Sequence, residues 1–163
     1  MTERDTCHML RTVMFGTLAS LAISTAAQAQ NSPDEATRIA QSAVVSYLAA
    51  FGQHDAKGIA NLFVPDGVFL PANGAPVVKG RDAIEHTWTE LFKTMGGQES
   101  IIIKDVIPVG ADAVVAINQF MIVGEGANAN KTISGRAAIT LAKTPNGWQY
   151  VSVVHQNDQP PPK

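Results

Sequence analysis

Three side chains in this sequence carry groups whose surroundings could make them reactive. Tyr47 lies on the apolar face of an expected helix, so its hydroxyl could donate a hydrogen bond to a ligand carbonyl or meet a buried polar group in the core. His155 follows the apolar run of the last expected strand and could act as a general acid or base near neutral pH. Asp66 could place a carboxylate in a pocket, although Pro65-Asp66-Gly67 is also an ordinary turn sequence. Together these residues indicate acid/base catalysis as one candidate function.

The orientation of the last strand decides whether His155 faces a pocket. His155 and Asn157 share the parity of Val153, whereas Trp148 and Tyr150 have the other parity. Both sets contain residues apolar enough to face the core, so the sequence leaves the inward face open. The alternatives for His155 are a catalytic role near the mouth of a pocket and a strand-end position in solvent.

Aromatic and polar side chains elsewhere could form the wall of a binding pocket. Trp88 lies in the apolar stripe of an expected helix, where core packing is the alternative role, and Asn118 interrupts an apolar strand face. Apolar walls provide affinity for a small, largely apolar molecule, and a few polar groups fix its orientation. The expected ligand-binding residues are Tyr47, Phe63, Phe69, Trp88, Phe92, Asn118 and Asn157.

The charged and histidine residues argue against several other functions. The formal net charge is −2 and no basic patch or charge run is present, so neither nucleic acid nor an anionic membrane is an expected partner. His54, His86 and His155 show no metal-ligand spacing, so we expect no metal site and no cofactor. The sequence also lacks the Gly-x-Ser-x-Gly signature of many serine hydrolases.

The first residues are typical of a secretory signal peptide. The apolar run from Val13 to Ile23 leads to Ala27-Gln28-Ala29, a small-x-small cleavage site. We therefore expect residues 1–29 to be removed and the mature protein to be periplasmic or secreted; the alternative is a buried N-terminal helix. Translation could also start at Met9. Since the only cysteine lies in this segment, the mature protein would contain no thiol.

Helix-capping residues predict three helices in the first half of the remaining chain. Ser32 and Glu35 form the expected capping box of the first helix, and Asp55 is the expected cap of a short second one. Asp82 and Glu85 form a second expected capping box, which would open the third helix.

The second half of the chain is rich in strand patterns separated by turns. An Asn73-Gly74 turn is expected to join a short hairpin at residues 68–70 and 77–79. Four longer strands are expected to follow as an antiparallel meander, over residues 100–109, 113–123, 131–143 and 148–156. A polar, disordered tail is expected at 159–163.

One strand has apolar residues on both faces. Val115 and Ile117 alternate with Val114 and Phe120, whereas a half-exposed antiparallel strand normally has one polar face. We therefore expect helices to cover one face of the sheet and a second copy of the chain to cover the other, as a homodimer.

Four motifs, taken in order, resemble a known superfamily. They are Y-x7-D at 47–55, L-F-x-P-D-G-V-F-L-P at 62–71, V-x-G-R-D-A-I at 78–84, and G-W with a polar end at 147–158. This order is similar to the SnoaL-like, nuclear transport factor 2-like superfamily, and most of all to its SgcJ/EcaC-type branch, which includes exported bacterial proteins. The resemblance implies an α+β domain over residues 30–158: a cone-shaped, cystatin-like roll with three N-terminal helices packed on a curved, mostly antiparallel sheet, a pocket at the open end, and frequent dimerisation.

The superfamily includes ketosteroid isomerases, so their catalytic residues can be compared with this chain. The resemblance places their oxyanion-binding tyrosine on Tyr47, their catalytic carboxylate on Pro71, and their second, proton-donating aspartate near Ala138. Two of the three catalytic groups are therefore missing, and we expect no ketosteroid isomerase activity.

Three functions remain open from the sequence. The leading one is an exported domain that binds a small, largely apolar molecule. The second is an enzyme of the isomerase, cyclase or dehydratase type that uses His155 or Asp66 as acid/base, with Tyr47 holding an oxyanion. The third is a non-catalytic dimerisation module whose cone is filled by its own side chains.

Overall fold

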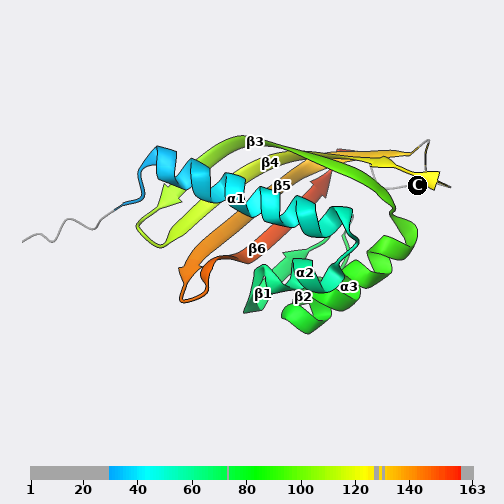
Figure 1. The fold of residues 1–163 in the computed structure, drawn as a ribbon, viewed down its shortest axis with the longest axis horizontal. Coiled ribbons are helices and arrows are strands. Elements are labelled where there is room, and N and C mark those ends of the chain that lie inside the picture. The colour runs from blue at the N-terminus through cyan, green and yellow to red at the C-terminus, as the bar shows by residue number, and fades with distance from the viewer. Residues whose placement is uncertain (1–29, 73, 127–128, 130, 159–163) are drawn as a thin grey trace, which may run out of the picture.

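A six-stranded sheet with three helices packed against it makes up the part of the chain that the structure describes (Figure 1). The structure is a computed structural model, and it describes residues 30–72, 74–126, 129 and 131–158. The expected signal peptide at 1–29, the tail at 159–163 and Asn73 of the expected hairpin turn lie outside the described residues.

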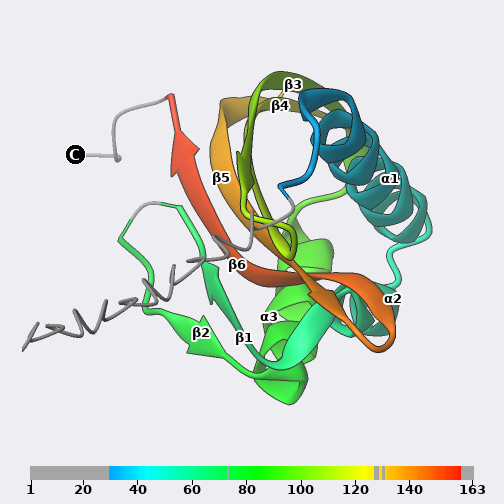
Figure 2. The ribbon, with the colours of Figure 1, turned by 90° about the vertical axis from the view of Figure 1, so that its left-hand side faces the viewer.

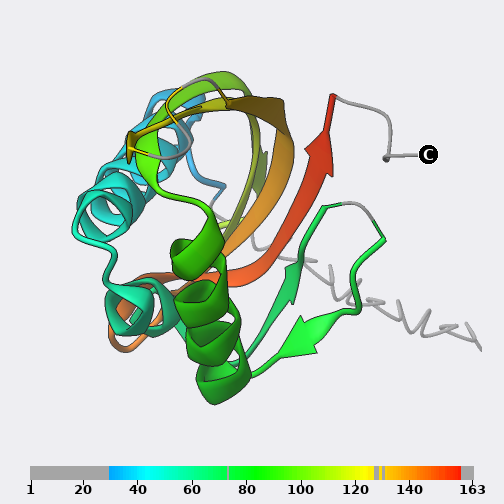
Figure 3. The same cartoon turned by 90° about the vertical axis from the view of Figure 1, so that its right-hand side faces the viewer.

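The order of the elements matches the predicted fold class. The helices are α1 (Pro33–Gly52), α2 (Ala56–Asn61) and α3 (Arg81–Thr94). The strands are β1 (Phe63–Leu70), β2 (Val78–Lys79), β3 (Gly97–Val109), β4 (Ala113–Gly124), β5 (Thr132–Thr144) and β6 (Gly147–Asn157). Their order in the sheet is β2-β1-β6-β5-β4-β3, and only the β1–β6 pair is parallel among these neighbours. Figures 2 and 3 show that the sheet curls around the helices, which confirms the predicted α+β roll with a curved, mostly antiparallel sheet.

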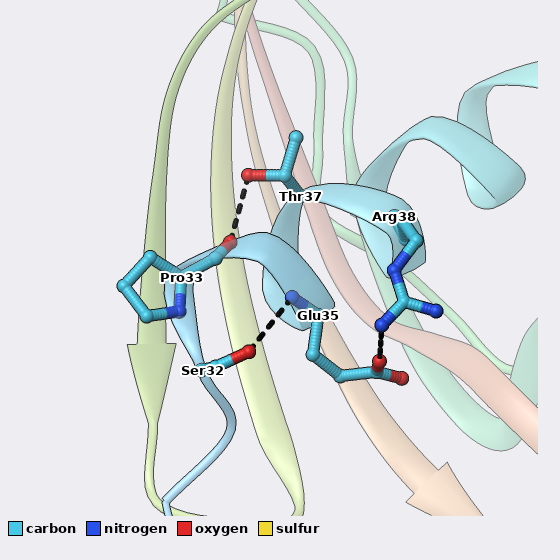
Figure 4. Close-up of polar contacts among 5 residues, drawn as sticks. All are labelled: Ser32, Pro33, Glu35, Thr37 and Arg38. Atoms are coloured by element: carbon cyan, nitrogen blue, oxygen red, sulfur yellow. Dashed lines mark hydrogen bonds and ion pairs between the residues drawn. The ribbon is translucent and has the colours of Figure 1, made fainter.

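The first two helices begin where their capping residues predict. The Ser32 hydroxyl accepts a 3.2 Å hydrogen bond from the backbone N–H of Glu35 (Figure 4). The Asp55 carboxylate accepts one of 2.8 Å from the N–H of Gly58. The expected capping box at Ser32 is incomplete, because the Glu35 carboxylate forms an ion pair with Arg38 on the next turn instead (Figure 4).

The predicted start of the third helix is wrong by two residues. The N-cap of α3 is Gly80, with φ of +86° and no side-chain cap, and Asp82 lies within the first turn. The Gly80 N–H donates to the carbonyl of Gly67 in β1 at 2.8 Å. Gly80 is therefore both hydrogen-bonded to β1 and the residue that precedes the helix. A glycine adopts that positive φ without strain, and because it has no side chain it provides no side-chain cap. Arg81 then fixes the helix to β1, since its Nε donates to the Phe63 carbonyl at 2.7 Å.

The predicted turn at Pro65-Asp66-Gly67 is an irregular part of β1. The pairing of β1 with β6 shifts register between Phe63 and Val68, so the strand continues through the tripeptide with a bulge instead of reversing. The predicted hairpin is confirmed beyond it, where Val68 pairs with Lys79.

A bulge in β6 explains why its inward face could not be predicted. Thr140 pairs with Ser152 and Leu141 pairs with Tyr150, so Val151 is an extra residue in β6. Because of this extra residue, even-numbered side chains before the bulge and odd-numbered side chains after it point to the same face of the sheet. Tyr150 and Val153 are both buried as a result.

The two apolar faces of β4 have different surroundings. Its inward residues, which are buried under the helices, are Val114, Ala116, Asn118, Phe120 and Ile122. On the opposite face Met121 and Val123 are exposed, with 44% and 43% of their surface accessible. The helices thus cover one face of the sheet, as predicted.

Candidate functional site

A small cavity lies between the helices and the concave face of the sheet. Its volume is about 30 Å³, whereas pockets for drug-sized ligands measure about 300–1,000 Å³. We call it the aromatic cavity; its lining residues are Val44, Tyr47, Ile59, Phe63, Phe69, Trp88, Glu99, Ile101, Asn118, Phe120, Ala137, Ile139, Tyr150, Val153 and His155.

The structure brings together most of the residues that the sequence singled out. Those that line the aromatic cavity are Tyr47, Phe63, Phe69, Trp88, Asn118 and His155. They come from α1, β1, α3, β4 and β6, so only the folded sheet and helices place them together.

Three predicted site residues lie outside the cavity lining. Asp66 is exposed in the irregular part of β1, and Asn157 is half-buried at the end of β6. Phe92 packs behind the cavity wall, with its ring centroid 5.5 Å from that of Trp88. The carboxylate that the sequence assigned to a pocket is therefore not supplied by Asp66.

Glu99 supplies the carboxylate of the cavity, and the sequence analysis missed it. The Tyr47 hydroxyl donates a 2.8 Å hydrogen bond to Oε2 of Glu99. Burial raises the pKa of Glu99 to about 7, although the hydrogen bond from Tyr47 opposes that shift. A carboxyl with this pKa takes up and releases protons near neutral pH, which is what a general acid/base needs. The same burial, with the Glu99 charge as a second cause, raises the pKa of Tyr47 well above its usual value, so this hydroxyl stays protonated and remains a donor.

A strand-parity signal could have found Glu99. The sequence predicts that this strand covers residues 100–109, which leaves Glu99 outside it. The strand begins at Gly97 instead, and Glu99 pairs with the buried Ile122 on the neighbouring strand β4. Extending the alternation of Ile101 back by two residues would have placed this carboxylate on the inward face.

His155 lies between two aromatic rings in the cavity wall. Its ring centroid is 5.3 Å from that of Phe69 and 5.2 Å from that of Phe120. Burial lowers the pKa of His155 to about 4, because a charged imidazolium would lose its hydration there. His155 is therefore neutral near physiological pH, where it can donate or accept a hydrogen bond.

Two further cavity residues have polar atoms without a protein partner. Asn118 is 1% exposed, and neither its Oδ1 nor its Nδ2 has a hydrogen-bond partner; the same holds for Nε1 of Trp88. A buried polar atom without a partner costs about 1–3 kcal/mol of stability. These atoms are therefore ready to bind water or a polar group of a ligand.

Tyr150 separates the aromatic cavity from a groove under α1. It lines both spaces, and its hydroxyl donates a 2.8 Å hydrogen bond to the backbone carbonyl of Ala43. The groove on the other side is lined by residues that include Ile39, Leu62 and Trp148. Movement of the Tyr150 ring would connect the cavity to this groove.

The described residues contain no group of three or more His, Cys, Asp or Glu side chains placed to hold a metal ion. Within those same residues, no helix is long and apolar enough to cross a membrane. The aromatic cavity contains a titratable carboxyl group on Glu99 and further polar side chains on Tyr47, Asn118, Trp88 and His155.

Sequence comparison identifies the family to which this arrangement belongs. The SnoaL-like domain pattern matches residues 44–155, a range that contains every lining residue of the aromatic cavity. The chain belongs to the SnoaL-like domain family. No curated protein sequence matches this SnoaL-like chain.

Solved structures share the fold at low sequence identity. A ketosteroid isomerase-like protein from Erwinia carotovora atroseptica superposes with a TM-score of 0.68 and 22% identity, over 78% of this chain and 99% of that one. A cystatin-like-fold domain of unknown function from Nostoc punctiforme gives 0.66 and 15%, over 77% and 78%. A protein of the NTF2-like family from Streptomyces avermitilis gives 0.62 and 15%, over 79% and 100%. These similarities confirm the SnoaL-like, nuclear transport factor 2-like fold.

The carboxyl group of this SnoaL-like domain has a different origin from that of the ketosteroid isomerases. The resemblance places their catalytic carboxylate on Pro71 and their second acid near Ala138, which is exposed on the outer face of β5. Glu99 reaches the cavity from β3 instead, where its carboxylate contacts the hydroxyl of Tyr47 on α1.

Proposed function

We propose that this SnoaL-like domain binds a small, largely apolar molecule in the aromatic cavity and transfers a proton to or from it through Glu99. The observation that carries the proposal is the hydrogen-bonded Tyr47–Glu99 pair in a wall made mostly of aromatic and aliphatic side chains. An isomerisation or a dehydration is the kind of reaction that one such carboxyl group can serve, because the same group can accept and return the proton.

Charge and burial support Glu99 over the other candidates as the acid/base. Its pKa of about 7 gives a mixture of both protonation states at neutral pH. His155 has a pKa of about 4 and is a poor proton donor at that pH, and Asp66 does not line the cavity. Tyr47 would then orient the Glu99 carboxyl and hold it in the cavity.

Deuterium exchange tests this proposal without knowledge of the natural substrate. Acetone in D₂O is a small ketone with exchangeable protons next to its carbonyl group, and NMR follows the exchange of these protons. We expect exchange to be faster with the wild-type protein than with Glu99→Gln, while Glu90→Gln, an exposed control on α3, behaves as wild type. Equal rates for the wild type and Glu99→Gln would contradict the role of Glu99.

A non-catalytic module is the second candidate, and the small volume of the cavity favours it. At about 30 Å³, the cone is nearly filled by its own side chains. Under this alternative no small molecule would perturb the NMR signals of the cavity methyl groups, and the fold would serve assembly only.

We also propose that the protein is a homodimer joined through the outer face of the sheet. Large apolar side chains are exposed on that face, including Ile102 and Ile107 on β3 and Met121 on β4. Such a patch is typical of a protein–protein interface. Sedimentation of a monomer at micromolar concentration would contradict this proposal.

We also propose that the protein is exported, because the sequence of residues 1–29 is typical of a secretory signal peptide. Cell fractionation should place the protein outside the cytoplasm, and the intact mass should correspond to a chain that begins at Gln30. A cytoplasmic protein that retains these residues would contradict it.

A further inference from the structure

The side-chain amide of Asn118 has no hydrogen-bond partner among the described residues. It lies at the centre of β4, and its neighbours across the sheet are Ile103 on β3 and Ala137 on β5. Neither neighbour has a polar side chain that could bind Oδ1 or Nδ2, and both of these atoms are buried and unpartnered. A leucine of similar size would fill the same position without this defect. The amide is therefore better explained by something that binds in the cavity than by packing.

The charges around the cavity exclude an anionic ligand. Its lining contains neither Lys nor Arg, so a carboxylate or phosphate would be buried without a counter-charge. Glu99, when ionised, would add repulsion. His155 stays neutral near physiological pH because burial lowers its pKa to about 4.

The available hydrogen-bond donors disfavour an ammonium ligand. Trp88 Nε1 can only donate, and Nδ2 of Asn118 also donates. An ammonium group carries donors and no acceptor, so it could donate to Oδ1 of Asn118 or to Glu99 but would leave both of these N–H groups unsatisfied. A neutral oxygen with lone pairs satisfies them.

We propose that Asn118, assisted by Trp88, makes the aromatic cavity selective for neutral molecules with a carbonyl or hydroxyl oxygen, which these two side chains bind. The inference rests on the proposed function in one respect, namely that the cavity is the ligand site. It adds the class of ligand and the residue that determines specificity.

Four probes of nearly the same size and branched shape test this selectivity: acetone, acetate, isopropylammonium and isobutene. Each has four heavy atoms, and binding is followed by NMR of the methyl groups of Ile59, Ile101 and Ile139 in the cavity wall. We expect acetone to bind at least about fivefold more tightly than each of the other three, the value of roughly one hydrogen bond. Acetate should remain excluded from Glu99→Gln as well, because that variant adds no positive charge.

Asn118→Leu and Trp88→Phe separate the polar contacts from packing. Each should weaken acetone binding by about fivefold or more and leave isobutene binding unchanged or stronger. Ile139→Val is the control, since trimming an apolar wall residue should change the affinity for both probes together.

The outcomes distinguish this inference from the proposed function. If isobutene or acetate binds as well as acetone, or if Asn118→Leu leaves acetone binding unchanged, the selectivity proposal is wrong while the cavity remains a binding site. If none of the four probes shifts the cavity methyl signals, the proposed function fails and the inference fails with it.

Discussion

Tyr47 and Glu99 are joined by a 2.8 Å hydrogen bond that connects the C-terminal half of α1 to the start of β3, 52 residues further along the chain. The bond places a donor and a titratable carboxyl group side by side in a wall otherwise made mostly of aromatic and aliphatic side chains. The predictions below depend on this pair and on its surroundings.

The pH dependence of stability should separate Glu99 from His155. Burial raises the pKa of Glu99 from 4.5 to about 7, so its contribution to stability is present below pH 4.5 and is lost as the pH rises through 7. Burial lowers the pKa of His155 from 6.5 to about 4, so its contribution is present above pH 6.5 and is lost as the pH falls through 4. The two effects oppose each other between about pH 4.5 and 6.5.

Urea unfolding of single variants between pH 4 and 7.5 measures each effect alone. In Glu99→Gln the free energy of unfolding should rise with pH up to 6.5, and in His155→Gln it should fall with pH up to 7. The steepest slope expected from one group is about 1.4 kcal/mol per pH unit. Identical pH profiles for both variants would show that neither group titrates as described.

Removing the Tyr47 hydroxyl should change Glu99 in a specific direction. The hydrogen bond stabilises the ionised carboxylate, so Tyr47→Phe should raise the pKa of Glu99 above its wild-type value. Near pH 8 the variant should also lose about 1 kcal/mol of unfolding free energy. Carboxyl ¹³C NMR measures the pKa, and an unchanged titration would mean that the hydrogen bond is absent in solution.

Replacing Asn118 should stabilise the fold. Asn118→Leu removes two unpartnered buried polar atoms and adds apolar surface, so we expect a gain in unfolding free energy of about 1 kcal/mol or more. Asn61→Leu, an exposed substitution of the same type at the end of α2, should change stability by less than about 0.5 kcal/mol. Destabilisation by Asn118→Leu in thermal unfolding would indicate that the amide has a structural partner.

A charge on the outer face of the sheet should disrupt the proposed dimer. Ile102 is 60% exposed on β3, and a lysine there would replace an apolar side chain of the outer face by a charged one. Ile102→Lys should sediment as a folded monomer, whereas Val45→Lys, at a 67% exposed position on α1, should leave the assembly unchanged. The same assembly for both variants would place the interface elsewhere.

The elements of this fold could be predicted because their local signals are strong. Ser32 and Asp55 cap helices in the structure as the sequence indicates, and the hairpin and the meander follow the predicted order. The predictions failed at Asp66 and Asp82, where tertiary pairing of β1 with β2 and β6 overrides the preferences of a turn or cap.

The site could be predicted only in part, because strand irregularities change which residues face inward. Tyr47, Trp88 and Asn118 were found from apolar periodicity alone. The bulge at Val151 concealed the orientation of β6, and the early start of β3 concealed Glu99. Pairing across the sheet determines the bulge, which no local sequence pattern reports, whereas the parity of Ile101 does place Glu99 on the inward face once β3 is known to begin at Gly97.

The most direct test of the central claim is the pH dependence of acetone deuterium exchange in the wild type and in Glu99→Gln. The account predicts a rate that rises with pH through a single ionisation near 7 in the wild type and is low and flat in the variant. The same profile in both proteins, or no catalysed exchange at any pH at which acetone binds, would contradict a proton-transferring role for Glu99.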